Sequence, residues 1–181
     1  MQFQPTQLRD VQLISLQVHR DARGHFMESF RLDQFQAHCG PYQLVQDNHS
    51  SSQDGVLRGL HFQLRRPQGK LLQLSRGRIF DVQVDLRRHS PTFGQWQGIW
   101  LDSAVPQLLW IPPGFAHGFY VSSGPAEVSY KCSDYYQPDD QYVLRYDDPT
   151  LDIPWPDAGN AVLSEKDQQG ESFAQLQARL L

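Results

Sequence analysis

Residues 56–63, VLRGLHFQ, carry an arginine, a glycine and a histidine inside an otherwise apolar run. The run predicts a strand, and a buried strand gains nothing from Arg58 or His61 unless these side chains do chemistry. Two kinds of chemistry suit the histidine, because a neutral imidazole either binds a transition metal or accepts a proton near neutral pH. The groups that other elements place beside His61 decide between them.

Three other polar side chains share a strand face with apolar residues. Side chains alternate between the two faces of a strand, which groups Lys70 with Leu72 and Leu74, His117 with Phe119 and Val121, and Tyr130 with Val128 and Cys132. Each alone has an ordinary explanation: a hydrogen-bonded core histidine, a packed tyrosine ring, or a lysine that reaches out to water. Together with His61 they predict a barrel lined by titratable groups.

The elements that must position these groups are mostly short strands. Alternating or apolar runs predict strands at residues 11–18, 25–30, 42–48, 56–63, 70–75, 78–86, 95–101, 107–111, 116–121 and 127–132, separated by glycines and prolines. This rhythm favours an all-β sandwich or jelly roll. Short helices are expected at residues 32–38 and from Ser164 to the C-terminus, because Ser164 and Asp167 resemble a capping box. Residues 147–157 hold three prolines and predict an irregular linker.

Composition limits the class of protein. A chain of 181 residues suits a single domain, residues 1–181, and 39% hydrophobic residues indicate a globular protein. A net charge of −4 without a basic tract argues against nucleic acid as a partner. Only two cysteines, no apolar N-terminal segment and no apolar run of about 20 residues predict a cytoplasmic protein that neither is secreted nor spans a membrane.

The metal hypothesis depends on a second motif. Residues 112–117, PPGFAH, resemble the second motif of cupins, which metal-binding members pair with an upstream H-x-H and a glutamate. Here the upstream strand offers His61 and then Gln63, a weak ligand for a transition metal, and no acidic residue follows closely. The sequence therefore predicts a barrel without a metal, which works by acid–base and electrostatic chemistry.

Longer motifs indicate one family. The segments GVLRGLHFQ, QGKLLQL, GRIFDVQVDLRRHSPTFGQW, LWIPPGFAHGF and SYKCSDYY, with DARGHFMESF and LSEKD at either end, span residues 21–167. Their combination resembles the dTDP-4-dehydrorhamnose 3,5-epimerase family, also known as the dTDP-sugar isomerase cupins. The resemblance implies an all-β, cupin-type jelly-roll barrel with short flanking helices including a C-terminal one. It also implies no cofactor, a homodimer, and the substrate dTDP-4-dehydro-6-deoxy-D-glucose on the route to dTDP-L-rhamnose.

The resemblance also implies catalytic roles. His61, the histidine of RGLH, would be the base, and Asp167 of LSEKD would orient its ring. Lys70 of QGK would stabilise the enolate that forms when a proton α to the 4-keto group is removed. Tyr130 of SYK would return a proton from the other face. From the residues alone, Asp167 could equally serve as a helix-capping residue.

A wider binding set follows from the same resemblance. Tyr136 would stack on thymine, Phe26 would offer a second aromatic surface, and the segment with Arg23 and Glu28 could reach across a dimer. The full set is Arg23, Phe26, Glu28, Gln46, Asp47, Asn48, Arg58, His117, Tyr136, Gln141 and Lys166. Gln141 stands where family members often carry a glutamate, which leaves its contact with substrate open.

Arg58 raises a geometric question. It has the opposite strand parity to His61, so a regular strand would send the two side chains to opposite faces. We expect a bulge at Gly59 that lets both reach one cavity.

Three alternatives stay open at this level. A single-centre 3- or 5-epimerase on a related dTDP-keto sugar would keep the same histidine, lysine and tyrosine. A non-catalytic sugar-nucleotide binding cupin would not need a matched acid and base. A metal-dependent cupin is the least favoured alternative, because the H-x-H motif is missing.

Overall fold

The computed structural model describes residues 1–180, and most of its regular structure is β. The strands are β1 (Gln2–Pro5), β2 (Gln12–Ser15), β3 (Val18–Asp21), β4 (Gly24–Met27), β5 (Gln46–Ser52), β6 (Leu57–Gln63), β7 (Lys70–Asp85), β8 (Trp96–Asp102), β9 (Gln107–Ile111), β10 (Phe115–Cys132) and β11 (Gln141–Val143). The helices are α1 (Leu32–Cys39), α2 (Glu165–Gln168) and α3 (Phe173–Arg179), with 3-10 turns at Pro138–Asp140 and Ala158–Asn160.

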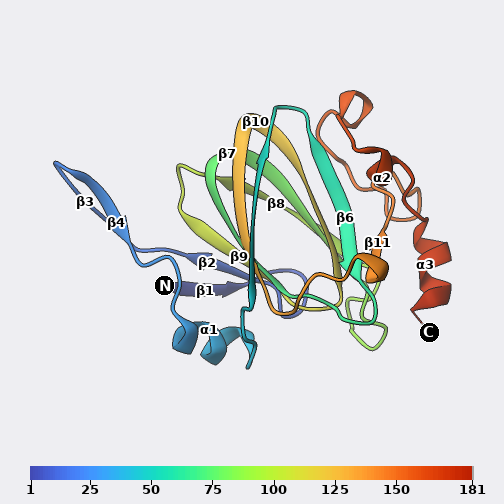
Figure 1. Cartoon of the computed structure of the whole chain (residues 1–181), viewed down its shortest axis with the longest axis horizontal. Helices are drawn as coiled ribbons and strands as arrows, with labels where there is room; N and C mark the ends of the chain where they lie inside the picture. Colours follow the sequence, from blue (N-terminus) through green and yellow to red (C-terminus); the bar gives the residue numbers. More distant parts are fainter. Residues whose placement is uncertain (181) are drawn as a thin grey trace.

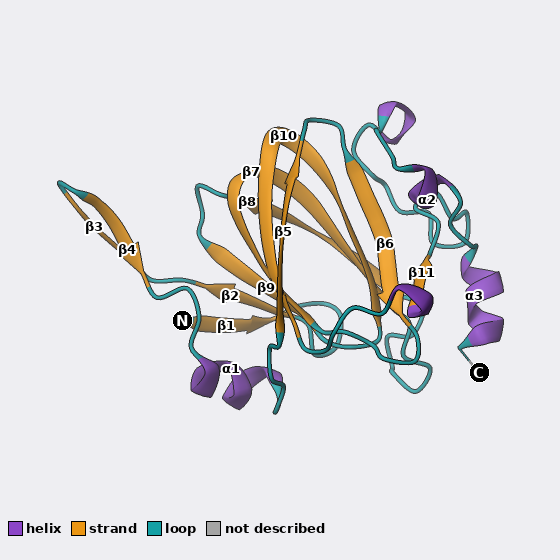
Figure 2. Ribbon diagram, in the orientation of Figure 1, coloured by secondary structure: helices purple, strands orange, loops and turns teal. Residues whose placement is uncertain are grey.

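Two long strands hold the sheet together. β7 and β10 pair antiparallel along their length; one end of the pair joins β9 and β5, and the other end joins β8 and β6 (Figure 2). The main path through the sheet is β1-β2-β9-β7-β10-β6-β11, with β5 paired to β10 and β8 paired to β7 beside it. The pair bends where its register shifts, between Val121 and Val128, and there a side chain at Gly77 would lie 2.5 Å from the Ser123 carbonyl oxygen. The predicted all-β jelly-roll fold is confirmed.

Apolar residues fill the barrel and cover both outer faces. The interior holds side chains from β7, β8, β9 and β10, among them Leu72, Leu109, Val121 and Val128. The outer face of β6, β7 and β10 is covered by the C-terminal segment through residues such as Trp155, and α1 covers part of the opposite face. Burial of this kind contributes roughly 25 cal/mol per Å² of apolar surface, so it is the main force that closes the barrel.

Several element boundaries differ from the predicted ones. The glycines near residues 77 and 124 bend continuous strands, so four predicted strands merge into β7 and β10. The first residues of the predicted strand at 42–48 are irregular, because β5 begins at Gln46. β1 and β11 have weak patterns and were not predicted. Residues 147–157 are irregular, as expected.

The predicted continuous helix from Ser164 to the C-terminus is wrong, because the helix is broken after α2; its expected last residue, Leu181, lies outside the described residues. Gly170 lies so close to Arg145 that a side chain there would be 2.7 Å from the Arg145 Cα atom. A new helix, α3, then begins at Ser172, which forms a full capping box with Gln175. Ser164 does cap α2, but only by accepting a hydrogen bond from the backbone of Asp167. This leaves the Asp167 carboxylate available for another partner.

The predicted bulge at Gly59 is confirmed. In the pairing of β6 with β10, Arg58 lies opposite Phe119 and His61 lies opposite His117, so two residues of β6 face one of β10. Gly59 has a φ of 117°, in the region that favours glycine. Because the bulge adds one residue between them, the side chains of Arg58 and His61 point to the same face of the strand and not to opposite faces.

Two further features complete the fold. The β3–β4 hairpin, the arm, projects away from the barrel (Figure 1). Within residues 1–180, no helix is long and apolar enough to cross a membrane.

The bulge generates a prediction. In Gly59→Ala, the new Cβ would lie 2.5 Å from the Gly118 Cα and 2.7 Å from the His117 carbonyl oxygen. We expect a loss of unfolding free energy of about 1–3 kcal/mol from backbone strain, plus a further loss from the contact. Urea denaturation would measure it. The matched control is Gly159→Ala, whose Cβ would have nothing within 4 Å; equal losses in both variants would contradict the prediction.

Candidate active site

The centre of the site is a hydrogen bond between β6 and α2. His61 Nε2 lies 2.5 Å from Asp167 Oδ1, and the two side chains are 29% and 4% exposed. Burial opposes ionisation of Asp167, but hydrogen bonds from His61, Ser164 and the Gly59 backbone outweigh it and hold the pKa of Asp167 below its usual value. Asp167 is therefore a carboxylate at neutral pH. It fixes the orientation of His61 and leaves Nδ1 of the ring to act.

Lys70 lies beside this pair. Its Nζ atom donates a 3.3 Å hydrogen bond to the His61 carbonyl oxygen. Removal from water lowers the pKa of Lys70, and the neighbouring Cys132 and Asp81 counteract this shift only in part. A lysine held in a poorly hydrated place is a strong partner for negative charge, because little water screens it.

Tyr130 faces the interior from β10. In the register it lies opposite Asn48 of β5 and Leu72 of β7, and its ring packs against the interior core. Burial raises the pKa of Tyr130, and Arg58 opposes the shift. The phenol therefore keeps its proton at neutral pH and can donate it. Arg58 itself donates from Nε to Ser52 Oγ of β5 at 2.9 Å.

His117 of β10 is buried and lies directly opposite His61 of β6 in the pairing of the two strands. Its Nε2 atom lies 2.9 Å from Oδ2 of Asp81, a fully buried carboxylate of β7. Burial lowers the pKa of His117, Asp81 opposes that shift, and Lys70 and His61 add to it. The imidazole is therefore neutral at physiological pH.

The rim of the site is polar and aromatic. Tyr136 donates from its hydroxyl to Gln141 Oε1 at 2.7 Å, and Lys166 donates to the same oxygen at 2.5 Å. Gln46 Oε1 accepts from the Tyr136 backbone N–H at 2.8 Å. Gln141, Tyr136, His61 and Lys70 line one small cavity. The amide at position 141 thus links the rim residues to each other.

Gln63, where a cupin metal site would have a histidine, is engaged elsewhere. Its Nε2 donates to the Arg66 carbonyl at 2.7 Å, and its Oε1 accepts from the Gln137 backbone at 2.7 Å. The side chain is buried and ties together the two loops beside the rim. Within residues 1–180, no group of three or more His, Cys, Asp and Glu side chains could hold a metal.

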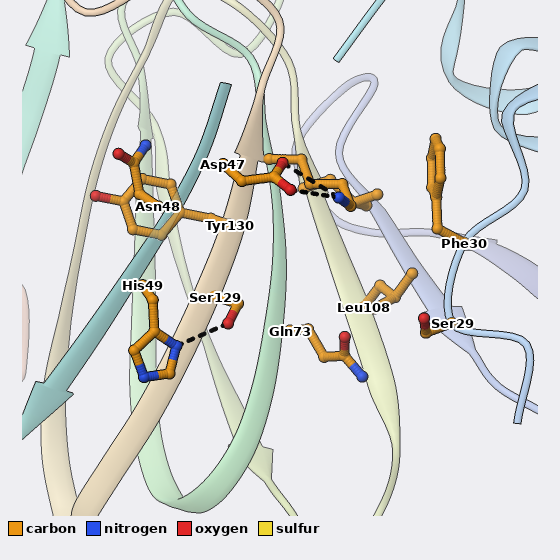
Figure 3. A pocket seen from close by; sticks show the side chains of 11 residues that line it. Ser29, Phe30, Asp47, Asn48, His49, Gln73, Leu108, Ser129 and Tyr130 are labelled. Atoms are coloured by element: carbon orange, nitrogen blue, oxygen red, sulfur yellow. Dashed lines mark hydrogen bonds and ion pairs between the residues drawn. The ribbon is translucent and has the colours of Figure 1, made fainter. Parts of the chain in front are cut away.

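Some predicted residues lie apart from this cavity. Asn48 and Tyr130 lie side by side, whereas Asp47 points the other way and pairs with Lys131 at 2.9 Å (Figure 3). Adjacent residues of a strand face opposite sides, which explains the separation of Asp47 from Asn48. Arg23, Phe26 and Glu28 belong to the arm and its base, and the arm lies far from β6 of the same chain, the strand that carries His61 (Figure 1).

Two functional features were missed by the sequence analysis. Asp81 is at a position of β7 whose side chain points into the barrel. From the sequence, a single acid in an apolar strand gives no sign of a function until its histidine partner is known. Gln63 was considered only as a metal ligand. The structure instead uses it to brace the loops that carry Tyr136.

A jelly-roll barrel with a histidine–carboxylate pair and a buried lysine at one cavity, and a protonated tyrosine facing the same interior, defines a cupin isomerase that moves protons with side chains. Comparisons with known proteins agree. Residues 5–175 match the family model described as dTDP-4-dehydrorhamnose 3,5-epimerase. The chain belongs to this family and is an isomerase.

Individual relatives support the assignment. A dTDP-4-dehydrorhamnose 3,5-epimerase of Pseudomonas aeruginosa is 51% identical over 91% of this chain and 92% of the relative. One from Neisseria gonorrhoeae is 48% identical over 97% of the chain, which spans about half of that relative, 54%. The crystal structure of a dTDP-6-deoxy-D-glucose-3,5-epimerase from Legionella pneumophila, in complex with dTDP-4-keto-L-rhamnose, has a TM-score of 0.95 and 44% identity over 99% of this chain and 96% of that one.

The His61–Asp167 pair makes stability depend on pH. The folded-state pKa of Asp167 is lowered, so its stabilisation is complete above the unfolded value of about 3.9 and is lost as pH falls through the folded value. We expect Asp167→Asn to lower the free energy of unfolding by about 1.5–3 kcal/mol at pH 7. The difference from wild type should shrink as pH falls below about 4.

Denaturant titrations between neutral and acidic pH would measure this dependence. Asp139→Asn is the matched control, because Asp139 is exposed and should show no such difference. A penalty for Asp167→Asn that stays constant down to acidic pH would contradict the expected linkage.

Proposed function

We propose that the protein epimerises dTDP-4-dehydro-6-deoxy-D-glucose at carbons 3 and 5 in dTDP-L-rhamnose biosynthesis. The observation that carries the proposal is the oriented His61–Asp167 pair with Lys70 beside it and Tyr130 in the same barrel. The match to relatives of this activity over most of the chain supports it. The reaction is proton transfer, so it needs no redox cofactor.

The first step forms an enolate. The protons on carbons 3 and 5 are both α to the 4-keto group, so either can be removed as the C–H electron pair moves toward the carbonyl oxygen. His61 accepts the proton at Nδ1, because Nε2 is bonded to Asp167. The Asp167 carboxylate stabilises the imidazolium that results, and Lys70 stabilises the oxyanion.

The second step inverts the carbon. Tyr130 keeps its proton at neutral pH and delivers it from its hydroxyl to the face opposite His61. The O–H bond breaks as the new C–H bond forms, and the carbonyl is restored. The phenolate and the imidazolium then exchange protons with solvent, which returns the site to its first state.

The nucleotide lies toward the rim. The Tyr136 ring stacks on thymine, with its hydroxyl held by Gln141, while Arg58 and Lys166 supply positive charge for the diphosphate. Gln46 and Asn48 of β5 complete the nucleotide set, while His117, opposite His61, faces the sugar. The Legionella relative was solved with a dTDP-sugar, which supports a nucleotide sugar as the ligand.

Deuterium exchange tests the proposed reaction. Wild-type protein incubated with dTDP-4-dehydro-6-deoxy-D-glucose in deuterium oxide should incorporate deuterium at carbons 3 and 5, as followed by NMR. His61→Ala should slow exchange by about 10²–10⁴-fold while nucleotide binding, measured by calorimetry, persists. Tyr130→Phe should impair epimerisation more than exchange, because abstraction precedes reprotonation.

Three results would go against the proposal. Exchange at one carbon only would identify a single-centre epimerase. Absence of exchange with intact binding would identify a sugar-nucleotide binding protein. Normal turnover by His61→Ala would contradict the assignment of the base.

We propose that the protein acts as a homodimer in which the arm of one chain reaches the site of its partner. The arm projects away from the barrel of its own chain, and it exposes Phe26 to 72% and the Arg23 side chain, near its tip, to 90%. An apolar ring and a guanidinium on a projecting hairpin suit contact with a nucleotide held by another chain. Glu28, at the base of the arm, would contact the substrate in the partner's site from that position.

Mixing two inactive variants tests this arrangement. If Arg23 acts on the partner's site, Arg23→Ala and His61→Ala chains that are unfolded and refolded together should form mixed dimers with one complete site. Activity should then return to about a quarter of wild type for random pairing. Arg20→Ala is a matched arm control that should not reduce activity. A monomer in analytical ultracentrifugation, or no recovery in mixed dimers, would contradict the proposal.

We further propose that residues 1–181 form one domain that works in the cytoplasm. The sheet draws on strands from β1 to β11, and the C-terminal segment packs on its outer face, which supports one domain. Cys39 and Cys132 are free thiols, which suits a reducing compartment.

A further inference from the structure

A chain of buried polar side chains runs from His117 across the interior of the barrel. Beyond Asp81, Gln83 donates from Nε2 to Asp81 Oδ1 at 2.5 Å, and Gln97 donates from Nε2 to Gln83 Oε1 at 2.8 Å. The chain ends at the backbone N–H of Leu8, which donates to Gln97 Oε1 at 3.2 Å. Asp81 and Gln83 are fully buried and Gln97 is 5% exposed.

The backbone N–H of Leu8, at the end of the chain, determines which group donates in each hydrogen bond between Gln97 and Asp81. A peptide N–H can only donate, so the oxygen of Gln97 must face Leu8 and its NH₂ group must face Gln83. The NH₂ group of Gln83 must then face Asp81, whose carboxylate accepts. Donation from Gln83 keeps a proton off Oδ1 and favours the ionised form of Asp81. As a carboxylate, Asp81 also accepts at Oδ2, so Nε2 of His117 carries the proton that the two groups share.

We propose that Gln83 and Gln97 are positioning residues that fix the tautomer of His117 through Asp81. His117 is thereby held neutral, with its proton on Nε2 and a lone pair on Nδ1, which has no hydrogen-bond partner among the residues that the structure describes. The group that faces Nδ1 in the bound substrate must be a donor, so His117 recognises a sugar hydroxyl and not a phosphate oxygen. This inference rests on the proposed function for the identity of the substrate.

The charges around His117 make the fixed tautomer necessary. The titratable groups that face the ring are Asp81 and Lys70 from β7 and His61 from β6. If His117 took up a proton, it would become a cation next to the Lys70 ammonium group and the His61 ring. Its Nδ1 atom would then be a hydrogen-bond donor and could not accept from a hydroxyl group. A carboxylate with a fixed acceptor role keeps the ring oriented without such a change.

Histidine ¹⁵N NMR of the protein without substrate tests the network directly. In wild type the His117 signals should show a protonated Nε2 and a bare Nδ1 that do not change between about pH 6 and 8. In Gln83→Leu, which leaves Asp81 Oδ1 without its donor, the signals should become those of a mixture of tautomers. In Gln83→Glu, a second carboxyl group beside Asp81 should make His117 titrate within this range, with a matching new inflection in the pH profile of kcat/KM.

Kinetics give the second readout. Both Gln83 variants should lose about 10- to 100-fold in kcat/KM, by analogy with the loss when groups that orient a metal-binding histidine are removed. The loss should be mainly in KM, because the proposed base and acid are untouched. Ser90→Ala is the matched control: it removes a hydrogen bond to Asp85, another buried carboxylate of β7 with no link to His117. It should change neither the His117 signals nor kcat/KM.

The outcomes separate this inference from the proposed function. A wild-type His117 protonated on Nδ1, or unchanged signals and kinetics in a folded Gln83→Leu, would overturn the inference. Should Gln83→Leu fail to fold, Gln97→Leu breaks the same chain one residue farther away and is judged by the same signals. The NMR experiment uses no substrate, so a failure of the proposed epimerase activity would leave this result intact.

Discussion

The hydrogen bond between His61 and Asp167 is the interaction on which the rest of the site depends. Its partners are 106 residues apart, one in an early strand and one in a short helix near the C-terminus. They meet only because the C-terminal segment packs its apolar residues against the outer face of β6, β7 and β10. Hydrophobic packing on the outer face of the barrel therefore positions the Asp167 carboxylate beside His61.

The barrel interior tolerates the carboxylates of Asp81 and Asp167 because each has hydrogen-bond partners. A buried carboxylate or imidazole without hydrogen bonds would be strongly destabilising. Asp167 has His61 and the cap of α2, and Asp81 has His117 and Gln83. The same pairing that makes burial acceptable also orients the rings, so stability and chemistry depend on one set of contacts.

Gln63 and His117, which stand where metal-binding cupins have ligands, make other contacts in this protein. Gln63 braces the loops that carry the aromatic rim, where a histidine would bind a metal. His117 is turned to a carboxylate that is already fixed by an amide. The scaffold thus keeps inward-facing polar positions while their partners change, which is how one fold serves different chemistry.

The sequence by itself determined the strand rhythm, the inward faces of Lys70, His117 and Tyr130, and the family, because period-two alternation and motifs are local properties. It also indicated the bulge at Gly59, since Arg58 and His61 have opposite parity. The family resemblance implied that Asp167 orients His61, while the residues alone left helix capping equally open. Only the tertiary structure shows that Asp167 does both, that Asp47 turns away, and that Gln83 and Gln97 extend the Asp81 pair across the barrel. These are contacts between residues distant in the chain, and their geometry depends on how the sheets fold together.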